Sequence, residues 1–210
     1  FAVAASGAAD ATISFTYPMT LDINSRISLS NNDSGTSNTV FGKNAGENLD
    51  AGSNYNVFIG DGVSDAAMND ALYNVGIGYQ ALTDLTTGDY NIAIGSNAGK
   101  YTTGASNTYV GSSAGSGAAG AESSNVGVGF QSLFKITSGT ENVAIGKDSM
   151  KDNTTGAGNT AVGVEALSNN TTAAENVAIG KLALYTATTA TLNVAIGNES
   201  LRLTNTGGSN

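Results

Sequence analysis

The chain has 210 residues, including 28 Gly, 1 Pro and no Cys, His or Trp, and its 17 acidic and 8 basic residues give a formal charge of −9. Without His or Cys, it cannot build a Ser-His-Asp triad, a cysteine nucleophile or a zinc site of the usual kind. The carboxylate excess disfavours nucleic acid and anionic membranes, which are bound through cationic side chains. No stretch approaches the roughly 18 apolar residues of a membrane helix. We therefore expect no catalytic, cofactor-binding or metal-binding residues, no nucleic-acid partner and no membrane insertion in this segment.

Residues 1–37 stand apart from the rest of the chain. Two alternating runs, residues 12–17 and 21–30, predict strands. We predict that 1–37 forms a β cap or adaptor that protects the strand edge of whatever follows. The chain starts with Phe1 and its opening residues lack the basic part of a signal peptide, so we expect a piece of a longer protein.

Residues 38–210 form a repeat array. The phrase Asn-x-x-(hydrophobic)-Gly recurs ten times at intervals of 16–18 residues, beginning at Asn38, Asn56, Asn74, Asn91, Asn107, Asn125, Asn142, Asn159, Asn176 and Asn193. A fixed short period predicts a solenoid in which each repeat forms one coil. One further step of 17 from Asn193 reaches Asn210, so we expect the array to continue beyond this chain.

The phrase itself has the pattern of a strand. Its second residue is always β-branched, its third is mostly Ala or Gly, and its fourth is Ile, Val or Phe. This alternation predicts a strand with one branched face and one small face. Strands in the same phase predict a parallel β-solenoid in which the Asn residues stack into an amide ladder. The fifth residue, always Gly, suits a corner with positive φ or a close backbone approach.

The residues after the phrase suggest how the coil closes. In nine of ten repeats two variable residues precede Ala or Ser and then Leu, Met or Gly, and a polar link such as residues 86–88 follows. We interpret each repeat as a strand, a tight turn, a second facing strand and a return loop. The small third residues permit close approach of another backbone or another subunit. Five leucines need burial, and we predict that they form apolar stripes meeting along the axis of a homotrimer, with a capped monomer as the alternative: Leu82, Leu133, Leu167, Leu184 and Leu201.

Several local patterns resemble sites but favour plainer interpretations. Residues 76–81 match a loose dinucleotide fingerprint, and residues 95–100 resemble a phosphate loop with one residue too few, yet both lie within the repeat. Residues 32–35 and 61–62 carry oxygen ligands for calcium at low density. Four carboxylates after the corner Gly could act as an acid–base pair, but a solvated charged face explains them better: Asp61, Asp148, Glu165 and Glu199.

Two aromatic residues are the candidate binding residues. Tyr79 and Phe130 occupy the first variable position after the corner Gly, where other repeats carry Lys or Ser. If these rings point outward, they could stack on sugar rings or a protein receptor; packing against a neighbouring loop is the alternative.

The recurrent sequence NVAIG, and above all the pair of repeats in residues 159–184, resembles the head repeats of trimeric autotransporter adhesins of the YadA-like type. The longer turn here is similar to the version in bacteriophage and other viral tail-fibre proteins. The resemblance covers residues 38–210. It implies a left-handed parallel β-roll, an intertwined or side-by-side homotrimer, and display outside the cell.

From this resemblance we expect a structural and adhesive fibre protein: a rigid trimeric segment of a viral tail fibre that displays a host-attachment surface. Its partners would be upstream and downstream fibre segments and a glycan or protein receptor on the host. The head of a bacterial adhesin is the alternative. A polysaccharide-cleaving tailspike ranks below both, because such enzymes need a long groove with clustered carboxylates, and a Thr-based ice-binding surface ranks last.

Overall fold

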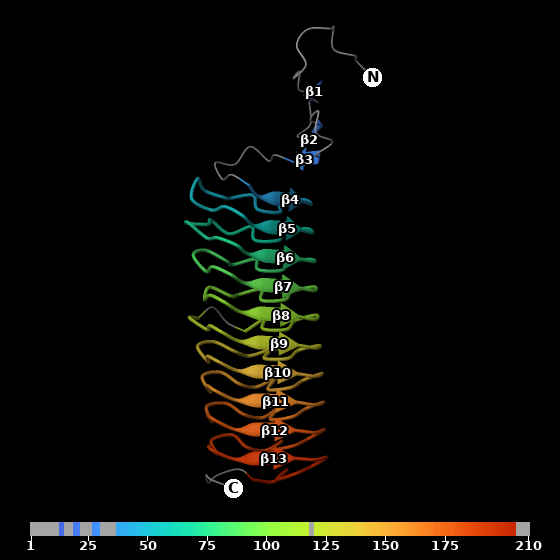
Figure 1. The fold of residues 1–210 in the computed structure, drawn as a ribbon, viewed down its shortest axis with the longest axis vertical. Coiled ribbons are helices and arrows are strands. Elements are labelled where there is room, and N and C mark those ends of the chain that lie inside the picture. Colours follow the sequence, from blue (N-terminus) through green and yellow to red (C-terminus); the bar gives the residue numbers. More distant parts are fainter. Residues whose placement is uncertain (1–12, 15–18, 22–26, 30–36, 118–119, 205–210) are drawn as a thin grey trace.

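The computed structural model describes residues 13–14, 19–21, 27–29, 37–117 and 120–204, and all its regular elements there are β-strands. Ten of them form one parallel sheet in chain order, and their coils stack into the long body of the molecule (Figure 1). Each strand has three residues: β4 (Thr39–Phe41), β5 (Val57–Ile59), β6 (Val75–Ile77), β7 (Ile92–Ile94), β8 (Thr108–Val110), β9 (Val126–Val128), β10 (Val143–Ile145), β11 (Thr160–Val162), β12 (Val177–Ile179) and β13 (Val194–Ile196). The predicted all-β parallel solenoid is confirmed.

Three further strands precede the array. β1 (Ile13–Ser14), β2 (Met19–Leu21) and β3 (Ile27–Leu29) form a separate antiparallel sheet in the order β1-β2-β3. β3 lies next to β4, at the N-terminal end of the stack (Figure 1). The other residues of the predicted strand runs lie outside the described residues, and the role of 1–37 as a cap stays a prediction.

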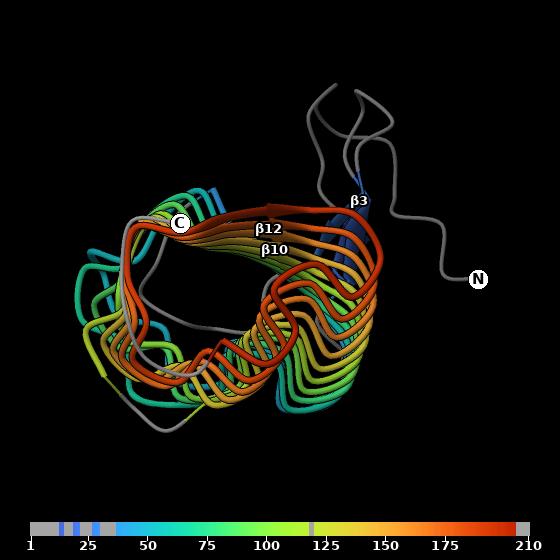
Figure 2. The same cartoon turned by 90° about the horizontal axis from the view of Figure 1, so that it is seen from below.

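The repeats stack in strict register. Every strand pairs with the strand one repeat away at the same three phrase positions, for example Val143 with Thr160 and Ile145 with Val162. Viewed along the stack, the backbones of successive coils superpose (Figure 2). The variation in repeat length, from 16 to 18 residues, is therefore absorbed in the links and leaves the strands in phase.

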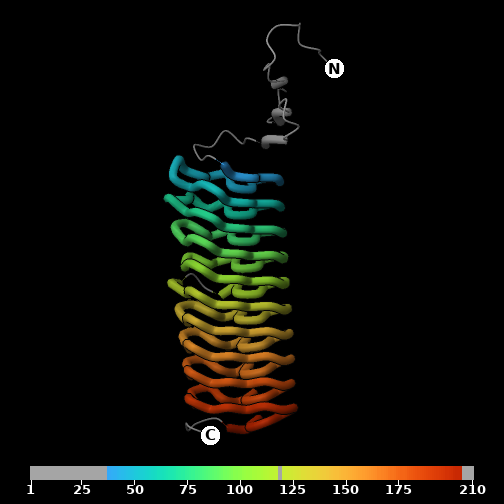
Figure 3. Tube along the Cα trace, in the orientation of Figure 1, coloured from blue at the N-terminus to red at the C-terminus, as the bar shows by residue number. Residues whose placement is uncertain are grey.

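The second wall of the coil differs from our expectation. The prediction of a second facing strand in each repeat is wrong, because the ten-stranded sheet holds one strand from each coil and the return segments are turns. These turns still bond from coil to coil: the Leu82 N–H donates to the Ala98 carbonyl at 3.1 Å, and the Met150 N–H donates to the Ala166 carbonyl at 3.0 Å. The tube trace shows these return segments stacked coil upon coil along the roll (Figure 3).

Left-handed backbone conformations explain why the return segment cannot be a strand. Gln80 and Leu82 have φ of +53° and +52°, and Glu165 and Leu167 have φ of +56° and +50°. Two such residues separated by one ordinary residue curl the chain back over its own strand. A left-handed conformation costs a non-glycine residue about 1–2 kcal/mol, so coil-to-coil hydrogen bonds and packing must hold it in place.

The corner glycine meets both conditions that the sequence suggested. Gly146 has a φ of +132°, and a Cβ placed on it would lie 2.5 Å from the carbonyl oxygen of Gly163 in the next coil. The other corner glycines before the last coil approach the following corner in the same manner. No other residue satisfies this geometry, because any Cβ would collide with backbone.

The core is thin and lies inside each coil. The middle residue of every strand in the array points inward, and Ala93, Ala144, Ala161 and Ala178 have no exposed surface. The leucine prediction is wrong for four residues, since Leu82, Leu133, Leu167 and Leu184 are completely buried against these small side chains in their own roll. Leu201, in the last described coil, is 36% exposed. Small third residues thus admit the chain's own return segment.

The predicted Asn ladder is confirmed and is buried. The Nδ2 of Asn142 donates to the Oδ1 of Asn125 at 3.1 Å and to the Gly156 carbonyl at 2.8 Å. In turn, the Oδ1 of Asn142 accepts from the backbone N–H of Asn159 at 3.1 Å and from its Nδ2 at 3.0 Å. Each amide thereby ties a strand to the link of its own coil and to the neighbouring coils.

Candidate functional site

The outward face of the ten-stranded sheet is a continuous apolar strip. The first and third residues of strands β4 to β13, which are the second and fourth residues of the repeat phrase, form what we call the outer strip. They point away from the core and are all at least partly exposed. Seventeen of the twenty are Val, Ile or Phe, the other three are Thr39, Thr108 and Thr160, and none is charged. Ile94 and Ile145, in the middle of the strip, are 38% and 40% exposed. Contiguous apolar surface of this kind is typical of an interaction site.

Tyr79 and Phe130, the two candidate binding residues, both point outward, with 53% and 47% of their surface exposed. They occupy the same position in coils three repeats apart, with Ser96 and Ser112 between them. Their rings are therefore accessible but do not form one cluster. Their role in binding stays a prediction.

A second aromatic feature was missed in the sequence. Tyr55, Tyr73 and Tyr90 immediately precede the Asn of three successive repeats, and their rings stack at 5.0 Å and 5.1 Å between centroids. The ring planes differ by 7° and 8°, and all three side chains are exposed. The recurring Tyr-Asn pair was the signal that could have predicted this stack, because residues at one repeat position are neighbours in a parallel solenoid.

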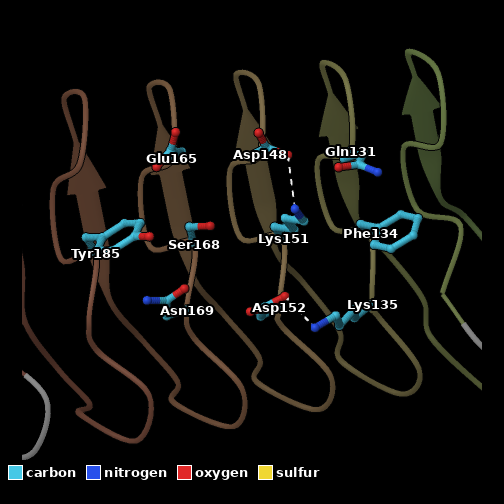
Figure 4. Close-up of a pocket in the computed structure, with 10 residues that line it drawn as sticks. All are labelled: Gln131, Phe134, Lys135, Asp148, Lys151, Asp152, Glu165, Ser168, Asn169 and Tyr185. Atoms are coloured by element: carbon cyan, nitrogen blue, oxygen red, sulfur yellow. Dashed lines mark ion pairs between the residues drawn. The ribbon is translucent and has the colours of Figure 1, made fainter.

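A groove crosses the return segments of the coils that begin with β9, β10, β11 and β12 (Figure 4). Its volume is about 550 Å³, within the range of sites that bind small ligands. The lining residues form three columns that run from coil to coil: Gln131, Asp148 and Glu165; Phe134, Lys151, Ser168 and Tyr185; and Lys135, Asp152 and Asn169. Phe134 and Tyr185 stand at the two ends of the groove (Figure 4).

The groove contains two ion pairs and a buried carboxylate. Lys135 Nζ lies 2.8 Å from Asp152 Oδ1, and Lys151 Nζ lies 3.8 Å from Asp148 Oδ1. Lys147 Nζ approaches the other oxygen of Asp148 at 3.5 Å. Asp148 is only 9% exposed, and its Oδ1 has no hydrogen-bond donor among the described residues because the Lys151 ammonium is too distant for one. A buried carboxylate oxygen without a donor is rare, and here the Lys151 ammonium offsets its charge without a direct hydrogen bond.

The four carboxylates singled out in the sequence separate into two groups. Asp148 and Glu165 line the groove, whereas Asp61 and Glu199 are exposed elsewhere on the roll. A solvated face therefore describes Asp61 and Glu199 but is wrong for Asp148. The possible calcium segment 32–35 lies outside the described residues. Within the described part of the chain, no three His, Cys, Asp or Glu side chains gather in a way that could hold a metal ion.

A buried acidic residue lies inside the roll, away from the groove. Glu122 is 2% exposed, and burial raises the pKa of its carboxyl group to about 7. Burial, and then the nearby Glu122 charge, raise the pKa of the Tyr109 hydroxyl well above its ordinary value. Neither Glu122 Oε2 nor the Tyr109 hydroxyl has a hydrogen-bond partner among the described residues. Since both groups are enclosed, we regard them as core residues that make the fold sensitive to pH.

Comparison of the chain with protein-family models, with curated proteins and with solved structures found no match. Among the residues that the structure describes, no helix has the length and apolar character needed to cross a bilayer.

Proposed function

We propose that the chain is a rigid segment of an extracellular trimeric fibre, of the kind that forms viral tail fibres and carries host-attachment surface. The observation that supports the proposal is the outer strip. The coils already bury Leu82, Leu133, Leu167 and Leu184, and yet two uncharged columns of mostly branched side chains run along the outside of the sheet. Covering these columns with a second and third copy of the same strip removes apolar surface from water along the whole roll.

The mechanical part of the function follows from the hydrogen-bond pattern. Each coil is joined to the next by strand, turn and Asn-ladder bonds, so bending the roll would strain several bonds at each interface. A left-handed winding and a three-chain assembly belong to this proposal. Threefold display would multiply weak surface contacts, because the second and third contacts of an anchored trimer form at high effective concentration.

The oligomeric state tests the proposal directly. Sedimentation equilibrium of the 20.9 kDa chain should give three times the monomer mass at micromolar concentration. Ile94→Lys and Ile145→Lys place a charge in the middle of the outer strip and should produce monomers that keep the circular dichroism spectrum of the roll. Thr87→Lys, an exposed change in a link, is the control and should leave the trimer intact. A wild-type chain that remains monomeric at every concentration contradicts the proposal.

Two further experiments separate the alternative functions. Peptide sequencing of the intact parent protein through its C-terminus would favour a bacterial adhesin if the repeats lead into membrane-barrel strands, and a viral fibre if they lead into a soluble domain. Release of oligosaccharide from a bacterial capsular or O-antigen polysaccharide would instead favour a tailspike enzyme.

A further inference from the structure

The groove on the coils of β9 to β12 has the architecture of a ligand site. Phe134, Lys151, Ser168 and Tyr185 occupy the same position in four successive repeats. A short serine between longer side chains creates the hollow, and the aromatic rings bound it at both ends (Figure 4). At a strand spacing of about 4.8 Å, the two rings are about 14 Å apart along the axis. A ligand that contacts both rings must therefore be elongated and run across the coils.

The ring at one end of the groove is held in place from outside. Arg202, one repeat beyond Tyr185 in the same column, places its guanidinium carbon 5.9 Å from the centroid of the Tyr185 ring. Arg202 is in turn paired with Glu199 at 3.2 Å. A cation against an aromatic face restricts the ring and lowers the entropy cost of stacking a ligand on it.

Polar groups between the rings are available to a ligand. Lys135 and Asp152 pair with each other and are therefore less available to a ligand. The side chains of Gln131, Glu165 and Asn169 make no hydrogen bond to any described residue, and all three line the groove. These three side chains present carboxylate and amide oxygens as acceptors and two amide groups as donors. Such a surface recognises a molecule rich in hydroxyl groups.

We infer that this groove binds a short neutral oligosaccharide. Sugar rings combine an apolar C–H face, which stacks on Phe134 and Tyr185, with hydroxyl groups that donate to Glu165 and accept from Gln131 and Asn169. Nucleic acid and other polyanions are disfavoured because three carboxylates outnumber two ammonium groups in the lining. A lipid or apolar peptide would leave the polar floor without partners. The inference deepens the proposed attachment function and rests on it for its biological purpose.

A glycan array tests the inference. The probe is the labelled full chain in its natural assembly, applied to an array of defined bacterial and animal oligosaccharides, followed by calorimetry with the strongest neutral binder. Phe134→Ala and Tyr185→Ala should each weaken binding about tenfold or more, because each removes a stacking platform. Val164→Ala, an exposed change on the same coil as Ser168 but outside the groove, should leave affinity unchanged. Circular dichroism and urea unfolding establish that every variant is folded.

A second variant blocks the groove without removing its walls. Ser168→Tyr fills the hollow with a side chain that the next coil already carries at the same position, as Tyr185, and should abolish binding in a stably folded roll. Absence of binding to every arrayed glycan overturns the inference, as does binding that survives Ser168→Tyr or is lost in Val164→Ala. A trimer that adsorbs to host cells but binds no glycan keeps the proposed function and loses this inference. If the chain is a monomer and binds glycan through the groove, this inference stands and the proposed trimeric fibre fails.

Discussion

The ring of Tyr109 occupies the space that a side chain at position 115 would need. A Cβ on Gly115 would overlap this ring, with only 2.5 Å to its Cγ. Tyr109 stands in the middle of β8, where Ala144 and Ala161 stand in other strands, and Gly115 takes the position that Leu167 holds in its coil. In this coil, the strand residue Tyr109 fills the core, whereas in the coil of β11 the return-segment residue Leu167 fills it. The side chains at positions 109 and 115 are therefore coupled.

This coupling predicts a compensating pair of substitutions. Tyr109→Ala should cost about 3–5 kcal/mol because it leaves a cavity, and Gly115→Leu alone should overpack the core. The double variant recreates the arrangement of Ala161 and Leu167, and the φ of +59° at Gly115 is close to the +50° that Leu167 already adopts. We expect urea unfolding to rank the double variant above both single variants. Destabilisations that simply add would contradict the coupling.

Glu122 predicts a decrease in stability as the pH rises. Its pKa is about 7 in the folded protein and near the model-compound value of 4.5 in the unfolded chain, so between these values the folded state holds a proton that the unfolded state has lost. The free energy of unfolding should therefore fall from pH 4.5 to pH 7 by roughly 3 kcal/mol and then level off. Urea titrations at several pH values would measure this slope.

Glu122→Gln supplies the control, because it stays neutral and should remove most of the slope while stabilising the protein above pH 7. Asp50 does not interfere in this window. A hydrogen bond from the Ser53 hydroxyl is the main cause that lowers the pKa of Asp50, so its contribution is lost only as the pH falls below the usual carboxyl range. An unchanged slope in Glu122→Gln would assign the pH dependence to other groups.

The Asn ladder predicts a large loss of stability for one buried amide. Asn142→Ala removes two donated and two accepted hydrogen bonds and leaves the Asn159 N–H and the Gly156 carbonyl without this partner. We expect a cost of about 3 kcal/mol or more, measured by thermal or urea unfolding. Asn69→Ala, at an exposed position, should change stability by less than about 0.5 kcal/mol. If both substitutions lowered the free energy of unfolding equally, the hydrogen bonds of the ladder would contribute no stability of their own.

Gly158 and Gly163, on either side of the boundary between two repeats, separate the effect of close backbone approach from the effect of a left-handed backbone. A Cβ on Gly163 (φ +141°) would lie 2.5 Å from the Gly180 carbonyl oxygen, whereas on Gly158 (φ +64°) its nearest neighbour would be 3.6 Å away. Gly158→Ala should therefore cost only about 1–2 kcal/mol for its left-handed backbone. Gly163→Ala should cost at least about 3 kcal/mol, because it also forces the next coil away. Differential scanning calorimetry of both variants would measure the difference, and similar melting temperatures would contradict it.

The parallel stack, the Asn ladder and the corner glycine could all be predicted from the repeat, because the phase of the phrase determines which residues become neighbours. Alternation alone, however, does not say which strand face points inward. In so narrow a coil, Ala or Gly in the middle of the strand leaves room for a leucine of the return segment, and this places Leu82, Leu133, Leu167 and Leu184 inside and the branched residues of the outer strip outside. The left-handed conformations of Gln80 and Leu82 were not predictable, since neither residue type favours positive φ.

Some features of the candidate sites could likewise be predicted from the sequence, and others could not. The sequence left open whether Tyr79 and Phe130 point outward or pack against a loop, whereas the Tyr55–Tyr73–Tyr90 stack would have followed from aligning the repeats. The groove could not be predicted, because its ends, Phe134 and Tyr185, are 51 residues apart in sequence and its hollow depends on the small size of Ser168.

Because the links absorb the differences in repeat length, the length of the rod can change by whole repeats. Deleting or duplicating one whole repeat would change the rod by about 4.8 Å and leave every remaining strand facing the same way. Matching changes in all copies of an assembly would preserve their contacts, so unequal crossing-over within the gene could tune how far the rod reaches without redesigning its cross-section.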